Sequence, residues 1–160
     1  MYHVIANNDV LAISTSTGTG KSTQVPKMLL EAGYGADRFA YNRRILVTEP
    51  RRIAAAGCAR RILDEVAENS GKYARTFGYA VRGENLNPQA QCLFVTEGVL
   101  LEMLQRDFML ADVSVVVLDE VHERSQAMDV IVGLVSRLCA LRRWTFDSEL
   151  KKVQESLSSE

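Results

Sequence analysis

The amino-acid sequence predicts an α/β domain with a mainly parallel sheet, on the basis of three observations. Short apolar runs rich in β-branched residues recur along the chain, and stretches whose apolar residues have helical spacing lie between them. Several runs are continuous instead of alternating, which is typical of parallel strands buried on both faces. With 160 residues, of which 47% are hydrophobic, the chain has room for one globular domain.

The first predicted elements are a strand at residues 9–13, a small flexible loop, and a helix at residues 22–30. The loop ends in Gly-Lys-Ser, and a strand, a loop and a helix in this order are the context of a P-loop, which binds the phosphates of a nucleotide. A surface turn rich in Gly, Ser and Thr is the alternative interpretation of this stretch, because Thr15 stands at the position where the P-loop pattern begins with Gly.

The loop has the residue types that phosphate binding needs. Gly18 and Gly20 let backbone N–H groups turn toward phosphate oxygens without obstruction by a Cβ. Lys21 can reach the β- and γ-phosphates, the Ser22 hydroxyl can bind Mg²⁺, and the following helix points its positive end at the anion. The predicted nucleotide-binding residues are Thr15, Ser16, Thr17, Gly18, Thr19, Gly20, Lys21, Ser22 and Thr23.

The middle of the chain continues the alternation of strands and helices. In order, the sequence predicts a strand at 45–48, an amphipathic helix from 51 to about 69, a strand at 77–82, a polar turn at 83–90, a strand at 92–95 and a helix that opens at 96–98. The most regular strand covers residues 113–118. This order of elements favours a parallel sheet with helices on its faces.

Asp119 and Glu120 directly follow that last strand. The carboxyl ends of parallel strands meet at one edge of the sheet, so we expect both carboxylates near the P-loop. Asp119 is placed to hold Mg²⁺, and Glu120, whose side chain points elsewhere, is the candidate to orient and deprotonate the attacking water. An Asp-Glu pair at a strand end is common by itself, but the P-loop about a hundred residues earlier favours its interpretation as part of a nucleotide site. The candidate metal ligands are Ser22, Asp119 and Glu120.

A last helix is predicted from about Gln126 to Leu141, and the chain beyond it is polar and charged. We therefore expect a nucleotide-binding domain over residues 1–143 and a weakly helical or disordered tail over residues 144–160. No signal peptide or membrane span is recognisable, and three widely spaced cysteines fit a reducing compartment. The expected location is intracellular, in the cytoplasm, the nucleus or an organelle.

Five stretches, in order, resemble motifs of the DEAH-box helicases of superfamily 2, in a form with Val at the third position of the signature. The resemblance spans roughly residues 4 to 139. The matching stretches are 119–125 (DEVHERS) for the signature, 16–26 (STGTGKSTQVP) for motif I, 48–55 (TEPRRIAA) for motif Ia, 78–84 (GYAVRGE) for a further family segment and 96–98 (TEG) for motif Ib.

The resemblance implies the first RecA-like domain, with three layers, of an ATP-dependent RNA helicase that couples ATP hydrolysis to movement along single-stranded RNA and to unwinding. It implies catalytic or coupling roles for Lys21, Glu120 and His122. It also implies RNA contacts, which would reach the sugar-phosphate backbone without reading bases; these candidates are Arg51, Arg52, Thr96 and Gly98.

The same resemblance implies ATP or another nucleoside triphosphate with Mg²⁺ as cofactors. Its implied partners are single-stranded RNA, a second RecA-like domain in the parent protein and protein activators, without a membrane. The local clusters of arginine agree with a limited RNA-binding patch, since the net charge of −1 excludes a protein that is positive all over.

The sequence departs from the family after residue 141. The family places a strand ending in Ser-Ala-Thr there, between the P-loop strand and the Asp-Glu strand, and this sequence has no such tripeptide. We therefore expect an incomplete sheet, a fragment or a divergent member, and almost no turnover by the chain alone. The alternative is a catalytically silent nucleotide-binding or regulatory module of the same fold. A P-loop kinase or GTPase would not explain Pro50-Arg51-Arg52 or His122-Glu123-Arg124.

Overall fold

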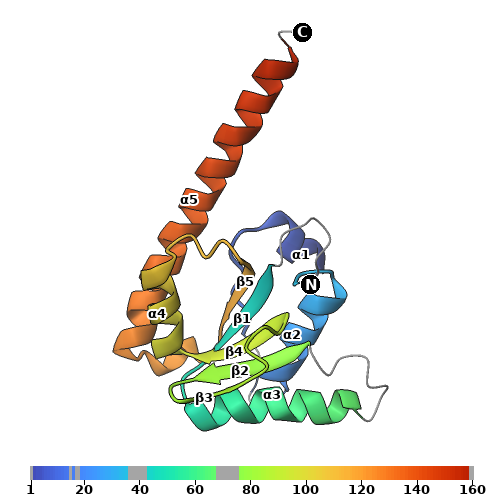
Figure 1. Ribbon diagram of the computed structural model, residues 1–160, viewed down its shortest axis with the longest axis vertical. Helices are drawn as coiled ribbons and strands as arrows, with labels where there is room; N and C mark the ends of the chain where they lie inside the picture. Colours follow the sequence, from blue (N-terminus) through green and yellow to red (C-terminus); the bar gives the residue numbers. More distant parts are fainter. Residues whose placement is uncertain (1, 15, 17–18, 36–42, 68–75, 159–160) are drawn as a thin grey trace.

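The computed structural model describes residues 2–14, 16, 19–35, 43–67 and 76–158 and confirms the α/β class (Figure 1). Its sheet has the strand order β3-β2-β4-β1-β5. The strands are β1 (Arg44–Glu49), β2 (Phe77–Val81), β3 (Glu84–Leu86), β4 (Cys92–Thr96) and β5 (Val113–Leu118). The helices are α1 (Tyr2–Asn7), α2 (Lys21–Glu31), α3 (Arg52–Ala67), α4 (Glu97–Arg106) and α5 (Gln126–Leu157), with a short 3₁₀ helix η1 (Val121–Glu123).

The sheet is mainly parallel, as the continuous apolar runs predict. β1 pairs in parallel with β4 on one side and with β5 on the other, and β2 pairs in parallel with β4. The short strand β3, which sequence analysis assigned to a polar turn, pairs antiparallel with β2. Gly83 joins the two strands at φ +85°, a left-handed conformation that glycine adopts without strain.

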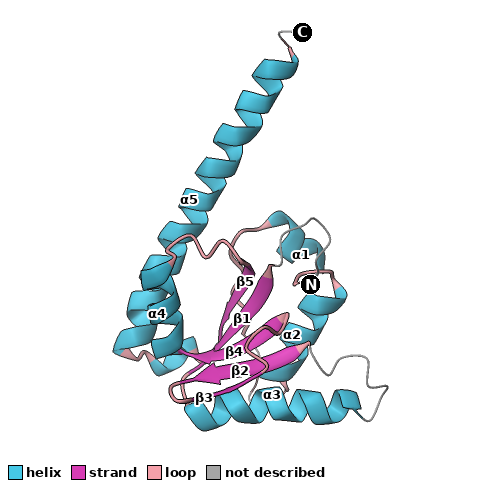
Figure 2. Ribbon diagram, viewed as in Figure 1, coloured by secondary structure: helices cyan, strands magenta, loops and turns pink. Residues whose placement is uncertain are grey.

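Helices cover both faces of the sheet and give three layers (Figure 2). Ile45 and Val47 of β1 pack into one core with Leu29 of α2 and Ile62 of α3. Leu46, which points to the opposite face, packs into a second core with side chains of α4 and α5. This alternation explains why three consecutive residues of β1, Ile45, Leu46 and Val47, are apolar.

Residues 9–13 form no strand, so the prediction of a strand before the P-loop is wrong. Val10 is 71% exposed and Ile13 is 42% exposed, although both belong to the same apolar run. A strand forms only where a neighbouring strand offers hydrogen-bonding groups. In the family, one strand lies between the P-loop strand and the strand that precedes Asp119, which is β5 here. In the described part of the chain that strand has no counterpart, and β5 is at the edge of the sheet.

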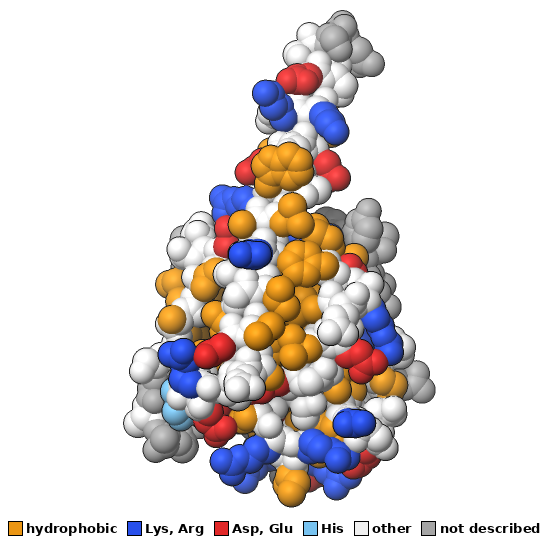
Figure 3. Space-filling model, turned by 90° about the vertical axis from the view of Figure 1, so that its left-hand side faces the viewer, with side chains coloured by type: hydrophobic (Ala, Val, Ile, Leu, Met, Phe, Trp, Pro, Cys, Tyr) orange, Lys and Arg blue, Asp and Glu red, His pale blue; other side chains and the backbone are white. Residues whose placement is uncertain are grey.

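The last helix is longer than predicted. α5 continues through Leu157 instead of ending near Leu141, because neither Gly nor Pro interrupts residues 134–157. Its second half points away from the sheet (Figure 1). Apolar side chains gather where this half leaves the body of the molecule, and charged side chains dominate farther along it (Figure 3). Trp144 and Phe146 are 67% and 64% exposed. The predicted division at residue 143 falls inside this helix and stays a prediction.

Candidate nucleotide site and adjoining loops

The carboxyl ends of the parallel strands bring two predicted site residues, Thr96 and Asp119, to one edge of the sheet together with Glu49. Glu49 ends β1, Thr96 ends β4 and Asp119 follows β5. Glu49 and Thr96 are partners in the register of β1 and β4. Strand ends at one edge are where α/β proteins bind their ligands, so this edge is the candidate site.

Ser22 and Asp119 contact each other directly across this edge. The Ser22 hydroxyl donates a hydrogen bond to Asp119 Oδ2, although 97 residues separate the two in the sequence. Asp119 Oδ1 accepts a hydrogen bond of 2.8 Å from the backbone N–H of Glu120. These contacts fix the carboxylate at the start of α2, where the sequence predicts it.

A hydroxyl beside a carboxylate fits Mg²⁺, which prefers oxygen ligands and takes few of them from the protein. Within the described ranges, no group of three or more His, Cys, Asp and Glu side chains could hold a metal ion. Mg²⁺ at nucleotide sites needs no such cluster, because phosphate oxygens and water supply the remaining ligands. Ser22 and Asp119 are therefore the residues that would hold it.

In the described part of the P-loop, two side chains donate hydrogen bonds to one backbone carbonyl of the same loop. Lys21 Nζ donates a hydrogen bond of 3.2 Å to the backbone carbonyl of Ser16, and the Thr19 hydroxyl donates one of 3.1 Å to the same carbonyl. Gly20 precedes α2 with φ +74°, which glycine tolerates, so the chain turns sharply into the helix. The start of α2 has no side-chain cap, and the positive end of a helix at this position attracts anions.

Not every predicted loop residue is placed at the candidate site. The Thr23 side chain is buried and its hydroxyl donates to the Gly20 carbonyl at 3.1 Å, so it is engaged within the first turn of α2. Thr15, Thr17 and Gly18 lie outside the described residues, and their roles stay predictions.

Glu120 and His122 form a pair next to Asp119. Glu120 has φ +52° and directly precedes η1, and its Oε2 lies 3.1 Å from His122 Nδ1. This φ places the backbone of Glu120 in the left-handed region, and the expectation that its side chain points away from that of Asp119 stays a prediction. The His122 side chain is 77% exposed and can therefore contact a further domain or ligand.

Glu49 is a site residue that sequence analysis missed. Its side chain is 4% exposed, and burial together with the negative charge of Asp119 raises the pKa of the Glu49 carboxyl to about 7. The Cys58 thiol donates a hydrogen bond of 3.5 Å to Glu49 Oε1, which partly offsets these effects. The sequence contained a signal for this residue. Glu49 ends an apolar strand, and Asp119 directly follows another, so both are expected at the same edge of a parallel sheet.

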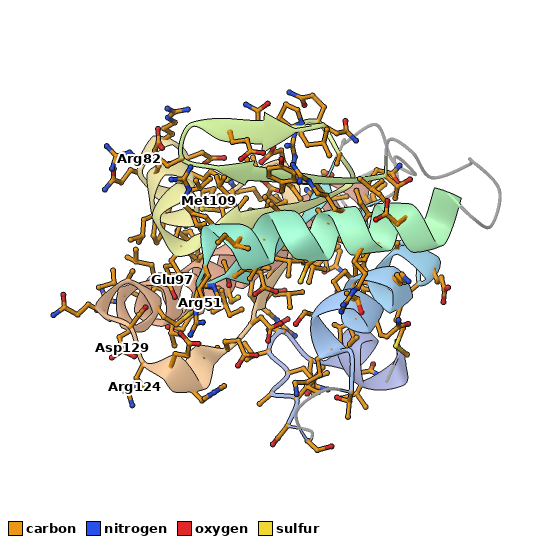
Figure 4. The ribbon with its side chains drawn as sticks, turned by 90° about the horizontal axis from the view of Figure 1, so that it is seen from below. Arg51, Arg82, Glu97, Met109, Arg124 and Asp129 are labelled. Carbon is orange, nitrogen blue, oxygen red and sulfur yellow. The ribbon has the colours of Figure 1, made fainter. Side chains whose placement is uncertain are left out.

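The predicted RNA-contacting residues lie at the starts of α3 and α4, beside this edge. Arg51 and Arg52 are exposed at the start of α3, and Arg52 Nη2 donates a hydrogen bond of 2.5 Å to the Arg82 carbonyl. Thr96 precedes α4 and Gly98 is exposed in its first turn. Figure 4 shows Arg51, Arg82 and Glu97 with Arg124 and Asp129 on one side of the molecule. The structure thus places motifs Ia and Ib next to the signature motif.

The fold and this edge define the class, a RecA-like P-loop domain with carboxylates at its strand ends. Residues 1–152 match the family of DEAD/DEAH box helicases, and the chain therefore belongs to that family. The resemblance that the five sequence motifs indicate is confirmed. Of the described helices, none combines the length and the apolar content needed to cross a membrane.

Three relatives illustrate the match. The chain is 41% identical over 150 residues to the ATP-dependent RNA helicase DHX33 of Drosophila melanogaster, a match that covers 93% of this chain and 20% of that protein. It is 36% identical over 152 residues to the ATP-dependent RNA helicase DEAH13 of Arabidopsis thaliana, with 94% and 12% covered. It is 38% identical over 140 residues to the ATP-dependent RNA helicase HrpA of Borreliella burgdorferi, with 87% and 16% covered. The chain thus spans a fifth or less of the length of these relatives.

Proposed function

We propose that this chain is the nucleotide-binding part of an ATP-dependent RNA helicase of the DEAH-box type. In the parent protein, ATP hydrolysis would drive movement along single-stranded RNA and unwinding. The observation that carries the proposal is the contact between the Ser22 hydroxyl and the Asp119 carboxylate. This contact joins the P-loop and the signature motif into one site, as hydrolysis of a nucleotide requires.

Each described residue of the site has a role in this proposal. Lys21 would leave the Ser16 carbonyl and bind the β- and γ-phosphates, and the N–H groups at the start of α2 would bind phosphate oxygens. Ser22 and Asp119 would hold Mg²⁺, whose chemistry at such sites is the neutralisation of phosphate charge. Glu120 would orient and deprotonate the attacking water, and His122, paired with Glu120, would link the site to other parts of the motor.

RNA would bind across the loops that begin α3 and α4. Exposed Arg51 and Arg52 can bind phosphates, and Thr96 and the backbone at Gly98 can donate hydrogen bonds to the sugar-phosphate backbone.

Turnover by the chain alone should be negligible, because arginine fingers from a second RecA-like domain contribute about 10³ to 10⁵ in rate in related enzymes. Protein activators would act on the assembled parent protein.

Calorimetric titration of the full chain with Mg-ADP, with and without single-stranded RNA, tests the proposal. Lys21→Ala should weaken binding about tenfold to a hundredfold, since it removes charge-assisted hydrogen bonds to phosphate. Lys27→Ala, which changes a lysine farther along α2, is the matched control and should bind as the wild type does.

Three results would contradict the proposal or one part of it. A folded chain that binds no Mg-ADP would favour the silent module. Equal binding by wild type and Lys21→Ala would place the nucleotide elsewhere, and rapid RNA-stimulated hydrolysis by the isolated chain would refute the predicted lack of turnover.

A further inference from the structure

An ion pair connects a candidate RNA-binding residue with the signature motif. Arg51 Nη2 lies 3.6 Å from Glu123 Oε1, and the two side chains are 77% and 39% exposed. Arg51 precedes α3, whereas Glu123 ends η1, the turn that follows Glu120. The pair therefore joins the loop proposed to bind RNA to the turn that carries the proposed water-orienting residue.

Glu123 pairs with Arg51, whereas the adjacent arginine, Arg124, pairs with a different carboxylate. The next cation, Arg124, is bound through two hydrogen bonds of 2.8 and 3.1 Å to the carboxylate of Asp129. Glu123 is tied to Glu120 through the backbone, since its N–H donates to the Glu120 carbonyl at 2.9 Å. A change in the partner of Glu123 would therefore reach Glu120 through a single turn of backbone.

The far end of this segment is fixed. The Ser125 hydroxyl donates a hydrogen bond of 2.7 Å to Glu97 Oε2 and accepts one of 2.9 Å from the backbone N–H of Met128. It thereby caps α5 and attaches it to the first turn of α4. Asp119 is held at the other end by Ser22. Between these two anchored residues, η1 is the part whose position the Arg51–Glu123 pair can influence.

We infer that Glu123 is a positioning residue that binds Arg51 in the RNA-free chain and releases it to an RNA phosphate. The inference rests on the proposed function and names how RNA occupancy reaches the nucleotide site. A guanidinium binds a carboxylate or a phosphate with the same donors, so the two compete for Arg51. The ion pair has one long contact, and a phosphate that accepts two hydrogen bonds would replace it.

The expected effect is small but specific. Exposed ion pairs are weak, so removal of Glu123 as a competitor should tighten RNA binding by about two- to fivefold. The gain requires Arg51, because the competition is for that side chain. By reciprocity, RNA binding should alter the affinity for Mg-ADP less when Glu123 is absent than in the wild type.

A double-mutant cycle on the full chain tests the inference through fluorescence anisotropy with a labelled single-stranded oligouridylate. The variants are Glu123→Gln, Arg51→Ala and the double substitution. Glu102→Gln is the matched control, since it removes a carboxylate from an exposed ion pair with Arg106 on α4. We expect tighter binding for Glu123→Gln alone, no such gain in the Arg51→Ala background, and wild-type binding for Glu102→Gln.

The outcomes separate the inference from the proposed function. If the wild-type chain does not bind RNA, both fall. If the wild type binds RNA but Glu123→Gln brings no gain, or an equal gain without Arg51, only the inference falls. The ratio of Mg-ADP affinities with and without RNA is the readout that a purely structural role would leave unchanged, and in Glu123→Gln it should move toward one.

Discussion

The two sides of the candidate site start from similar sequence but differ in structure. Residues 113–118 are an apolar run that forms β5 and pairs in parallel with β1. Residues 9–13 are also an apolar run, yet they form no strand and leave Val10 71% exposed. The difference is the neighbour, because β-branched composition favours a strand only where a partner and a packed face exist. Local sequence alone therefore does not decide which run becomes a strand.

This difference gives the two sides of the site unequal support. Asp119 continues from a strand of the sheet, and its backbone N–H lies 3.4 Å from the Thr48 carbonyl of β1. The described residues before the P-loop, 2–14, form no strand, and the loop's support comes from α2, whose Leu29 packs into the core. The Ser22–Asp119 contact joins the two sides. The following substitutions compare them, in order of decreasing expected effect.

The largest contrast should be between a buried side chain of the sheet and an exposed one of the N-terminal segment. Phe94 is fully buried in β4 between β1 and β2, so Phe94→Ala should lower the free energy of unfolding by about 3–5 kcal/mol. Val10→Ala should change it by less than about 0.5 kcal/mol, because Val10 is exposed. Urea unfolding measures both. Similar losses would show that residues 9–13 are an integral part of the core.

Sequence reasoning predicted well the elements whose signal is local. The strands β1, β4 and β5 are confirmed, and each is a short apolar run; β2, predicted from its alternating pattern, is confirmed too. The helices α3 and α4 are confirmed as well, and each has apolar residues at helical spacing. The contact between Ser22 and Asp119 follows from the rule that parallel strands end at one edge. These predictions needed no knowledge of which strands are neighbours.

The errors concern features that depend on distant partners. A strand at residues 9–13 needs a neighbour, and the pKa of Glu49 depends on its burial, on Asp119 and on Cys58, which come from other parts of the chain. The short strand β3 pairs only because the chain reverses at Gly83. α5 extends past Leu141 because residues 134–157 contain neither Gly nor Pro, although its buried residues, Met128, Ile131 and Leu138, all lie before that point.

The next prediction concerns how the free energy of unfolding depends on pH through Glu49, on the side of the site that contains Asp119. The pKa of Glu49 rises from 4.5 to about 7 in the folded chain, first through burial and then through Asp119. Between these values the unfolded chain loses the proton and the folded chain keeps it, so the free energy of unfolding falls as pH rises from about 4.5 to 7. The loss should reach at most about 3 kcal/mol. Glu49→Gln, which keeps the shape, should remove this part of the slope.

Urea unfolding at pH 5, 6, 7 and 8 without Mg²⁺ compares the variant with the wild type. The stability advantage of Glu49→Gln should grow with pH and level off above about 7. A difference that stays constant over this range would mean that Glu49 titrates at its ordinary pKa, and that the strand-end carboxylates are better solvated than their burial indicates.

The smallest effect should come from the contact that attaches the N-terminal segment to α5. Arg143 Nη1 lies 2.6 Å from Asp9 Oδ2, and the two side chains are 61% and 53% exposed. Because water and salt screen such pairs, Asp9→Asn should lower the Tm by no more than about 2 °C, and the difference should vanish at about 1 M salt. Glu102→Gln, which removes another exposed ion pair on α4, should have a similarly small effect on the Tm. A loss that persists in high salt and approaches that of Phe94→Ala would mean that the segment before the P-loop is as firmly held as the sheet, and the contrast between the two sides would fail.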